Sequence, residues 1–173
     1  MHLFPSSVAG GVLAPVPLTP QAFLPFGTVL QAPPSPGRAI NQGSAERFDL
    51  VDDLQLASQG GRAQLALFRA QARRFPLGVQ EMECHRLGSQ TFVPLGLLRF
   101  VIVVAVAGSP PGAADLHAFV ANGRQGITLA PGTWHHALLA VDAGDFVVVE
   151  RAAASVDCDI VRLPAPRQVI WEA

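Results

Sequence analysis

Lysine is absent from this chain of 173 residues, in which all 12 basic residues are arginine. The absence excludes a lysine Schiff base and a lysine general base from its chemistry. Charged residues make up only 14% of the chain and the formal net charge is -1, which gives no support to nucleic acid or an anionic membrane as a partner. Because 50% of the residues are hydrophobic, the chain can bury a substantial core, and its length suggests one domain.

The sequence also lacks long apolar runs and is poor in cysteine. The longest apolar run, residues 100–107, is too short to cross a bilayer. The N-terminus has no basic segment, and glycine and proline interrupt its apolar stretch, so we expect no signal peptide. The two cysteines, Cys84 and Cys158, are compatible with one disulfide or with two free thiols. We favour free thiols in a cytoplasmic protein that does not bind membranes.

Turn residues divide the chain into short segments. Residues 1–17 are rich in proline and glycine and are expected to form a loose N-terminal tail, followed by a single domain over residues 18–173. Thr19 is suited to capping a short helix that begins at Pro20 and ends by Gly27. Beyond it, period-two patterns and short apolar runs predict strands over residues 28–31, 63–69, 79–86, 90–94, 100–107, 115–120, 133–140, 146–151 and 157–162.

Many short strands at intervals of about ten residues predict an all-β protein, an antiparallel sandwich or barrel. The strand over residues 100–107 is apolar on both faces. We therefore expect it to be buried on both sides, either within the barrel wall or at a subunit interface.

A polar strand carries candidate metal ligands. Strand alternation places Glu81, Glu83 and His85 on one face, where two carboxylates and an imidazole would line a cavity wall. Imidazole and carboxylate groups together suit a divalent metal ion. Gln90 offers a neutral oxygen ligand or a hydrogen bond that orients one. The alternative is that both glutamates face solvent.

Two adjacent histidines follow a glycine-containing turn. His135 and His136 point to opposite faces of a strand, so one of them enters the cavity and the other lies at the surface or an interface. The preceding turn, Pro131-Gly132, favours His135 as the inward residue.

Several polar residues are candidate ligand contacts. Arg69 ends a predicted strand and Arg47 begins another, and either would hold a substrate carboxylate or would face solvent. Glu150 and Arg151 close an apolar strand and form either an ion pair or a ligand contact. Asn41 and Asn122 lie near glycines, and turn formation accounts for both.

Gly126, Pro131-Gly132 and His135 resemble the second sequence motif of the cupins, and Glu83-x-His85 followed by Gln90 resembles a modified first motif. The combination is similar to the ureidoglycolate lyase family of the cupin superfamily. The resemblance extends from about Leu18 to Arg162, and the matching stretches are residues 18–23, 40–43, 85–94, 122–126, 134–136 and 157–159.

The resemblance implies a cupin-type antiparallel β-barrel or jelly roll with a short N-terminal helix. It implies a homodimer that cleaves ureidoglycolate to glyoxylate and urea in allantoin and purine catabolism, with a divalent metal, nickel in this family, and no organic cofactor. The metal ligands would be His85, Gln90 and His135, and the catalytic residues Glu83, His136 and Glu150. The substrate contacts would be Asn41, Arg47, Arg69, Asn122 and Arg151.

This chain departs from the family pattern at Cys84, Leu129 and Ala130, where the family usually carries arginine, tyrosine and histidine. These departures motivate two alternatives. One is a cupin enzyme that acts on another small hydroxy acid or carbonyl compound. The other is a non-catalytic barrel that binds a small ligand.

Overall fold

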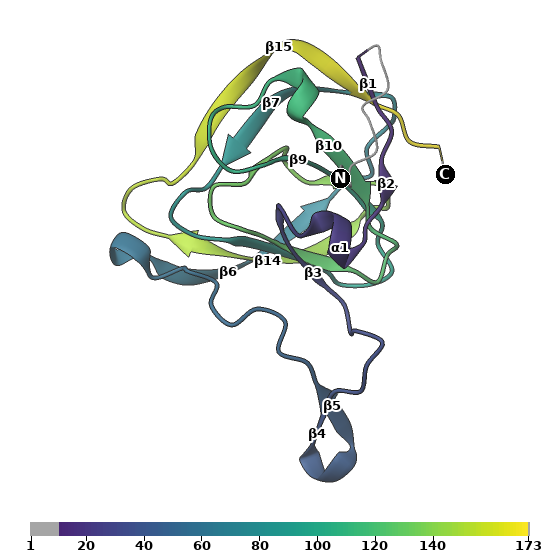
Figure 1. Cartoon of the computed structure of the whole chain (residues 1–173), viewed down its shortest axis with the longest axis vertical. Helices are drawn as coiled ribbons and strands as arrows, with labels where there is room; N and C mark the ends of the chain where they lie inside the picture. Colours follow the sequence, from purple (N-terminus) through teal and green to yellow (C-terminus); the bar gives the residue numbers. More distant parts are fainter. Residues whose placement is uncertain (1–10, 173) are drawn as a thin grey trace.

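Two curled β-sheets face each other as the walls of a barrel in the computed structural model, which describes residues 11–172 (Figure 1). The eight-stranded sheet runs in the order β1 (Val12–Leu13), β15 (Asp159–Val169), β7 (Leu77–Cys84), β12 (Trp134–His135), β9 (Phe100–Ala105), β10 (His117–Val120) and β2 (Val16–Pro17), and β13 (Leu139–Ala140) also pairs with β9. The five-stranded sheet runs β3 (Gly27–Leu30), β11 (Gly126–Leu129), β8 (Gln90–Pro94), β14 (Gly144–Ala152) and β6 (Arg62–Ala70). The prediction of an all-β, cupin-like fold is confirmed.

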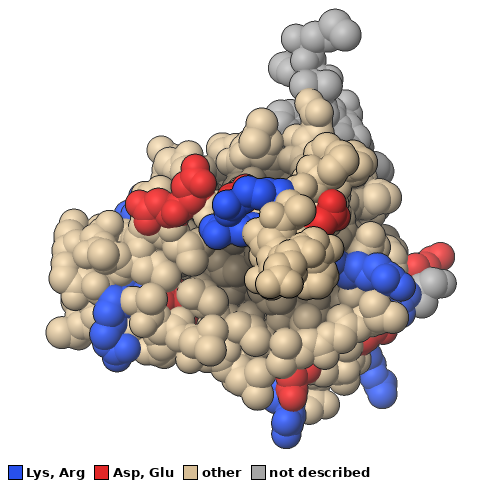
Figure 2. All heavy atoms as spheres, turned by 90° about the horizontal axis from the view of Figure 1, so that it is seen from below, with Lys and Arg blue, Asp and Glu red and all other residues tan. Residues whose placement is uncertain are grey.

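A hairpin stands away from the barrel, as the lower part of Figure 1 shows. It consists of β4 (Arg38–Ile40) and β5 (Ala45–Arg47), joined by a 3₁₀ turn over Asn41–Gly43. Seen from below in Figure 2, the surface is largely uncharged, with arginine and acidic side chains scattered over it. The sequence does not predict this hairpin, because strands of three residues are too short to display a period, and Arg47, which was expected to begin a strand, ends β5.

The N-terminal helix α1 (Pro20–Phe23) forms where the capping pattern predicts it. The Thr19 hydroxyl accepts a hydrogen bond from the backbone N–H of Ala22, and Pro20 occupies the first turn, where no N–H partner is needed. Phe23 is fully buried and anchors this single turn to the barrel interior.

Three expectations about the strands need correction. Residues 12–17 were expected in a loose tail, but β1 and β2 pair in parallel with β15 and β10 at the sheet edges, where proline is tolerated; residues 1–10 lie outside the described part. The strand expected over residues 133–140 is broken into β12 and β13. β15 continues to Val169 through Pro164 and Pro166, with irregular pairing between Arg162 and Arg167.

The apolar core has two parts separated by the larger sheet. Phe100 and Phe146 meet edge to face inside the barrel, with ring centroids 5.4 Å apart. Met82 and Trp134 belong to the second cluster, which packs on the other face of the sheet. Every residue of β9 is buried and its side chains alternate between the two clusters, so the expectation that this strand is buried on both faces is confirmed. Among residues 11–172, no helix combines the length and apolarity that a membrane crossing requires.

Candidate active site

Glu83 and His135 occupy opposed positions on neighbouring strands. The antiparallel register of β7 and β12 pairs Trp134 with Cys84 and His135 with Glu83. Trp134 and Cys84 pack into the second core cluster, so Glu83 and His135 share the opposite face, toward the barrel interior. Their side chains meet there, with 3.3 Å between Oε1 of Glu83 and Nε2 of His135.

The turn before β12 holds His135 next to His85. Gly132 has φ +84°, a backbone conformation that favours glycine, and its N–H donates a 2.7 Å hydrogen bond to the carbonyl oxygen of His85. The two imidazole rings lie with centroids 5.2 Å apart. The prediction that His135 is the inward histidine is confirmed, because its side chain is buried in the barrel.

Backbone carbonyls select the tautomer of both histidines. Nδ1 of His85 lies 2.5 Å from the carbonyl oxygen of Asp157, and Nδ1 of His135 lies 3.0 Å from that of Thr133. Because a carbonyl oxygen only accepts, each Nδ1 carries a hydrogen, and the lone pair of each Nε2 points toward a position where a cation would bind. Nε2 of His85 is buried and has no hydrogen-bond partner among the described residues.

The ligand atoms of Glu83, His85 and His135 all lie within 4.8 Å of one another. Gln90, from β8, donates its amide N–H to Glu150 over 2.9 Å, which turns its Oε1 toward Nε2 of His135 at 3.1 Å. Two imidazole nitrogens, a carboxylate and an amide oxygen are therefore gathered in one place. The lone pairs of these four groups repel one another unless a positive charge lies among them. Imidazole nitrogens and carboxylate and amide oxygens are ligand atoms that divalent metals prefer in proteins. These residues fit a divalent metal ion.

Without a metal ion, a proton on Nε2 of His135 would supply the positive charge at the contact between His135 and Glu83. Its hydrogen bond to Glu83 holds the pKa of that carboxyl below the usual 4.5, against the opposing effect of burial. A metal ion bound by the three side chains would take the place of this proton.

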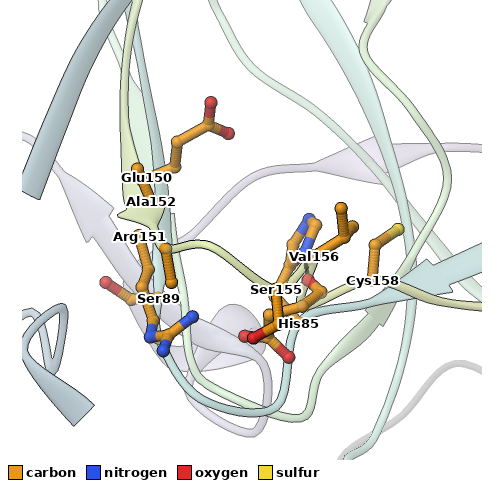
Figure 3. Close-up of a pocket in the computed structure, with 11 residues that line it drawn as sticks. His85, Ser89, Glu150, Arg151, Ala152, Ser155, Val156 and Cys158 are labelled. Carbon is orange, nitrogen blue, oxygen red and sulfur yellow. Dashed lines mark hydrogen bonds between the residues drawn. The ribbon is translucent and has the colours of Figure 1, made fainter. Parts of the chain in front are cut away.

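A cavity of about 240 Å³ adjoins the cluster at His85. Figure 3 shows residues of β14 on one side, including Glu150 and Arg151, and His85 with the loop that leads into β15 on the other. Small side chains dominate the rest of the lining: Gly88, Ser89, Ala152, Ala153, Ser155, Val156, Asp157 and Cys158. Burial raises the pKa of the Cys158 thiol, and both cysteines are free.

Arg151 lines the cavity and packs closely against two glycines. A Cβ added at Gly61 would lie 2.4 Å from Nε of Arg151, and one at Gly88 would lie 2.7 Å from its Cβ. The guanidinium donates from Nε to the carbonyl oxygen of Ser58 at 2.9 Å and from Nη2 to that of Gln59 at 3.2 Å. Within residues 11–172, Arg151 forms no ion pair with a carboxylate, so its charge is available to an anionic ligand. The ion pair considered for Glu150 and Arg151 is not formed: consecutive side chains of β14 leave the strand on opposite faces, and Glu150 accepts from Gln90 while Arg151 donates to Ser58.

The structure does not bring the other two candidate arginines to the cavity. Arg69 lies opposite Asp145 in the register of β6 and β14, at the end of β14 away from Glu150, and the two side chains pair at 2.8 Å. Arg47 lies on the projecting hairpin and pairs with Asp49 at 2.6 Å. The register and the hairpin are non-local features, and the residue types alone do not reveal them.

Asn41 and Asn122 also lie outside the cavity lining, in turns. Asn41 has φ +52° in the turn of the projecting hairpin. The side-chain oxygen of Asn122 accepts a hydrogen bond from the backbone N–H of Arg124 at 2.9 Å. Their positions agree with the turn-forming roles that the sequence suggests.

His136 does not line the cavity. Its Nδ1 lies 2.8 Å from the carbonyl oxygen of Ala137, and burial lowers the pKa of its imidazole. It contributes with His135 to a separate recess of about 10 Å³ among apolar side chains. Glu150 and the residues of the cluster are the candidate catalytic side chains that the fold brings together.

The site also contains three residues that the sequence did not single out: Ser89, Ser155 and Asp157. Asp157 belongs to a stretch matched to the family, but nothing in the sequence indicates that it contacts His85. That contact follows from the pairing of β15 with β7, which sets Asp159 opposite Cys84.

Comparisons with known proteins identify the family of this chain. A sequence model described as ureidoglycolate lyase matches residues 11–170. A protein named ureidoglycolate lyase from Pseudomonas syringae pv. syringae (strain B728a) is 44% identical over 144 residues, covering 83% of this chain and 85% of its own. Proteins of the same name from Pseudomonas entomophila (strain L48) and Burkholderia cepacia are 40% and 44% identical, covering 89% and 84% of this chain and 93% and 83% of their own. This chain belongs to the ureidoglycolate lyase family.

Proposed function

We propose that this chain cleaves ureidoglycolate to glyoxylate and urea, as a step of allantoin and purine catabolism. The observation that carries the proposal is the lining of one cavity, which combines His85 of the three-residue cluster with Glu150 and with Arg151, an arginine that has no carboxylate partner among residues 11–172. The substrate carries a hydroxyl, a carboxylate and a ureido group on one carbon. A cavity of about 240 Å³ suits a molecule of this size better than a drug-sized ligand, which occupies about 300–1,000 Å³.

The reaction needs a base, an acid and no redox cofactor. A proton leaves the hydroxyl oxygen, whose electron pair forms the carbonyl of glyoxylate. The carbon–nitrogen bond then breaks, and the departing nitrogen takes up a proton to give urea. Substrate and products contain the same atoms, and no hydride is transferred, so no organic cofactor is required.

We assign Glu83, His85 and His135 as the residues that would hold a divalent metal, which the family resemblance identifies as nickel. The ion would supply positive charge to the substrate oxygens and lower the pKa of the hydroxyl. Gln90 orients two members of the site, because its amide contacts His135 on one side and Glu150 on the other.

Glu150 is the residue that we assign to proton transfer, since Glu83 is engaged with His135 and His136 lies outside the cavity lining. A positioned acid or base contributes about 10²–10⁴-fold to rate. Arg151 binds the substrate carboxylate through the guanidinium hydrogens that the Ser58 and Gln59 carbonyls leave unused.

We further propose that the protein is a cytoplasmic homodimer. Two free cysteines support a reducing compartment. The projecting hairpin and the exposed Leu65 and Leu67 of the edge strand β6 support association with a second copy. Light scattering coupled to size-exclusion chromatography tests this state, and a mass of one chain would contradict it.

The test of the proposed function joins metal analysis to an assay of urea and glyoxylate release from racemic ureidoglycolate. We expect equal amounts of the two products, with turnover that falls on chelation and returns with Ni²⁺. A panel of other 2-hydroxy acids serves as the comparison. Turnover of another hydroxy acid alone would favour the rival enzyme. Thermal stabilisation by glyoxylate or oxalate without turnover of any substrate would favour the binding barrel.

The variant His85→Ala provides the control for the site. We expect it to lose nearly all turnover and to keep the far-ultraviolet circular dichroism of the barrel. Full activity in this variant would refute the metal assignment.

A further inference from the structure

Asp157 contacts three consecutive residues after β7. Its backbone carbonyl oxygen lies 2.5 Å from Nδ1 of His85. Its carboxylate accepts the backbone N–H of Arg86 at 2.9 Å through Oδ1 and that of Leu87 at 2.8 Å through Oδ2. A single residue of the loop between β14 and β15 thus holds both the imidazole of His85 and the backbone that follows it.

The Asp157 carboxylate is needed because strand pairing does not constrain the backbone of residues 85–87. β7 ends at Cys84, so the N–H groups of Arg86 and Leu87 lie beyond the strand ladder and take Asp157 as their acceptor. These two bonds fix where the chain of residue 157 lies relative to residue 85. They therefore fix the carbonyl oxygen against which the His85 ring is set.

We propose that Asp157 is a positioning residue of the metal site. By binding the 85–87 segment, its carboxylate keeps His85 in the Nδ1–H tautomer and presents Nε2 to the site shared with Glu83 and His135. The inference rests on the proposed metal function of that cluster. This role differs from a purely structural one. If Asp157 were only structural, its substitution would lower the stability of the fold without changing the tautomer of His85.

The chain offers a matched control in Asp159. Its carboxylate binds the same segment, through Nε of the Arg86 side chain, but within residues 11–172 it forms no hydrogen bond to the imidazole of His85 or to the backbone N–H groups that Asp157 binds. The variants are Asp157→Ala, Asp157→Asn, which keeps one acceptor oxygen, and Asp159→Ala.

The first measurement titrates each metal-free protein with Co²⁺, followed by visible absorption, and with Ni²⁺, followed by calorimetry. We expect Asp157→Ala to bind both ions about 10–100-fold more weakly and to change the Co²⁺ spectrum. Asp157→Asn should fall between this variant and the wild type, while Asp159→Ala should stay within about twofold of the wild type. Equal affinities and spectra in all four proteins would overturn the inference and leave the proposed function standing.

The second measurement needs no metal. Proton–nitrogen NMR of the imidazoles in the metal-free protein should show His85 in the Nδ1–H form, and Asp157→Asn should shift it toward a mixture of tautomers. An unchanged His85 signal would overturn the inference, and Asp157→Asn carries this test even if Asp157→Ala does not fold. Failure of the wild type to bind Co²⁺ and Ni²⁺ would instead refute the proposed metal site, so the two failures are distinguishable.

Discussion

The carboxylate of Glu83 and the imidazole of His135 face each other across two antiparallel strands, at 3.3 Å between Oε1 and Nε2. The pairing is direct, so the contact is fixed by the sheet and not by a flexible loop. Their contact therefore rests on two paired strands of the barrel wall.

Glu83→Gln should weaken divalent metal binding by at least about tenfold, because it replaces an anionic ligand by a neutral one. Calorimetric titration with Ni²⁺ measures the change. Glu81→Gln is the matched control, since Glu81 lies two residues earlier on the same strand but is exposed and outside the cluster. Equal losses in both variants would show that net charge and not ligation is being measured.

Arg151→Gln should raise the KM for ureidoglycolate by about 10–100-fold, because hydrogen bonds to a charged group contribute about 1.5–3 kcal/mol. Steady-state kinetics provide the measurement. Arg124→Gln removes an exposed arginine outside the cavity lining and should leave KM unchanged. An unchanged KM in Arg151→Gln would remove Arg151 from the substrate site.

Gly132→Ala should lower the free energy of unfolding by about 1–2 kcal/mol, because φ at this position is +84° and an added Cβ would lie 3.2 Å from that of Ala107. It should also weaken Ni²⁺ binding, since the Gly132 N–H holds the turn to His85. Gly43→Ala is the control: φ is +88° there, but an added Cβ has no neighbour within 4 Å. We expect similar strain and normal metal binding in Gly43→Ala, measured by urea denaturation and calorimetry.

Asp142→Asn should lower Tm at neutral pH by no more than about 4 °C. The Arg99 guanidinium and backbone N–H hold the pKa of the Asp142 carboxyl below its usual 3.8. The folded protein therefore binds the proton less readily than the unfolded chain, so the contribution is full above about pH 4 and is lost as pH falls through the folded pKa. Thermal scans should show the gap between variant and wild type closing in acid. A gap that is constant with pH would rule out the ion pair as its source.

Local sequence signals predicted much of the fold. Thr19 and Pro20 define the helix start with neighbouring groups alone, and the alternation over residues 90–94 reproduces β8 at both ends. The Pro131-Gly132 turn likewise selected His135 over His136, because a turn fixes which side of the next strand faces inward. The sequence did not predict β1, β2, β4 and β5, since no period can be read from two or three positions, and it did not predict the four-residue β11.

The chemical identity of the site was also present in the sequence, as histidine, glutamate and glutamine on segments that resemble two cupin motifs. What the residue types could not decide was which of several similar groups belong together. Arg69 and Arg151 are chemically equal and lie on neighbouring strands. In the register of β6 and β14, however, Arg69 lies opposite Asp145 and pairs with it, whereas Arg151 lines the cavity. Asp157 reaches His85 only because β15 pairs with β7. Local structural propensity depends on adjacent residues and can therefore be predicted from the sequence. Strand register and cross-sheet packing join residues far apart in sequence, so they are decided only in the folded barrel.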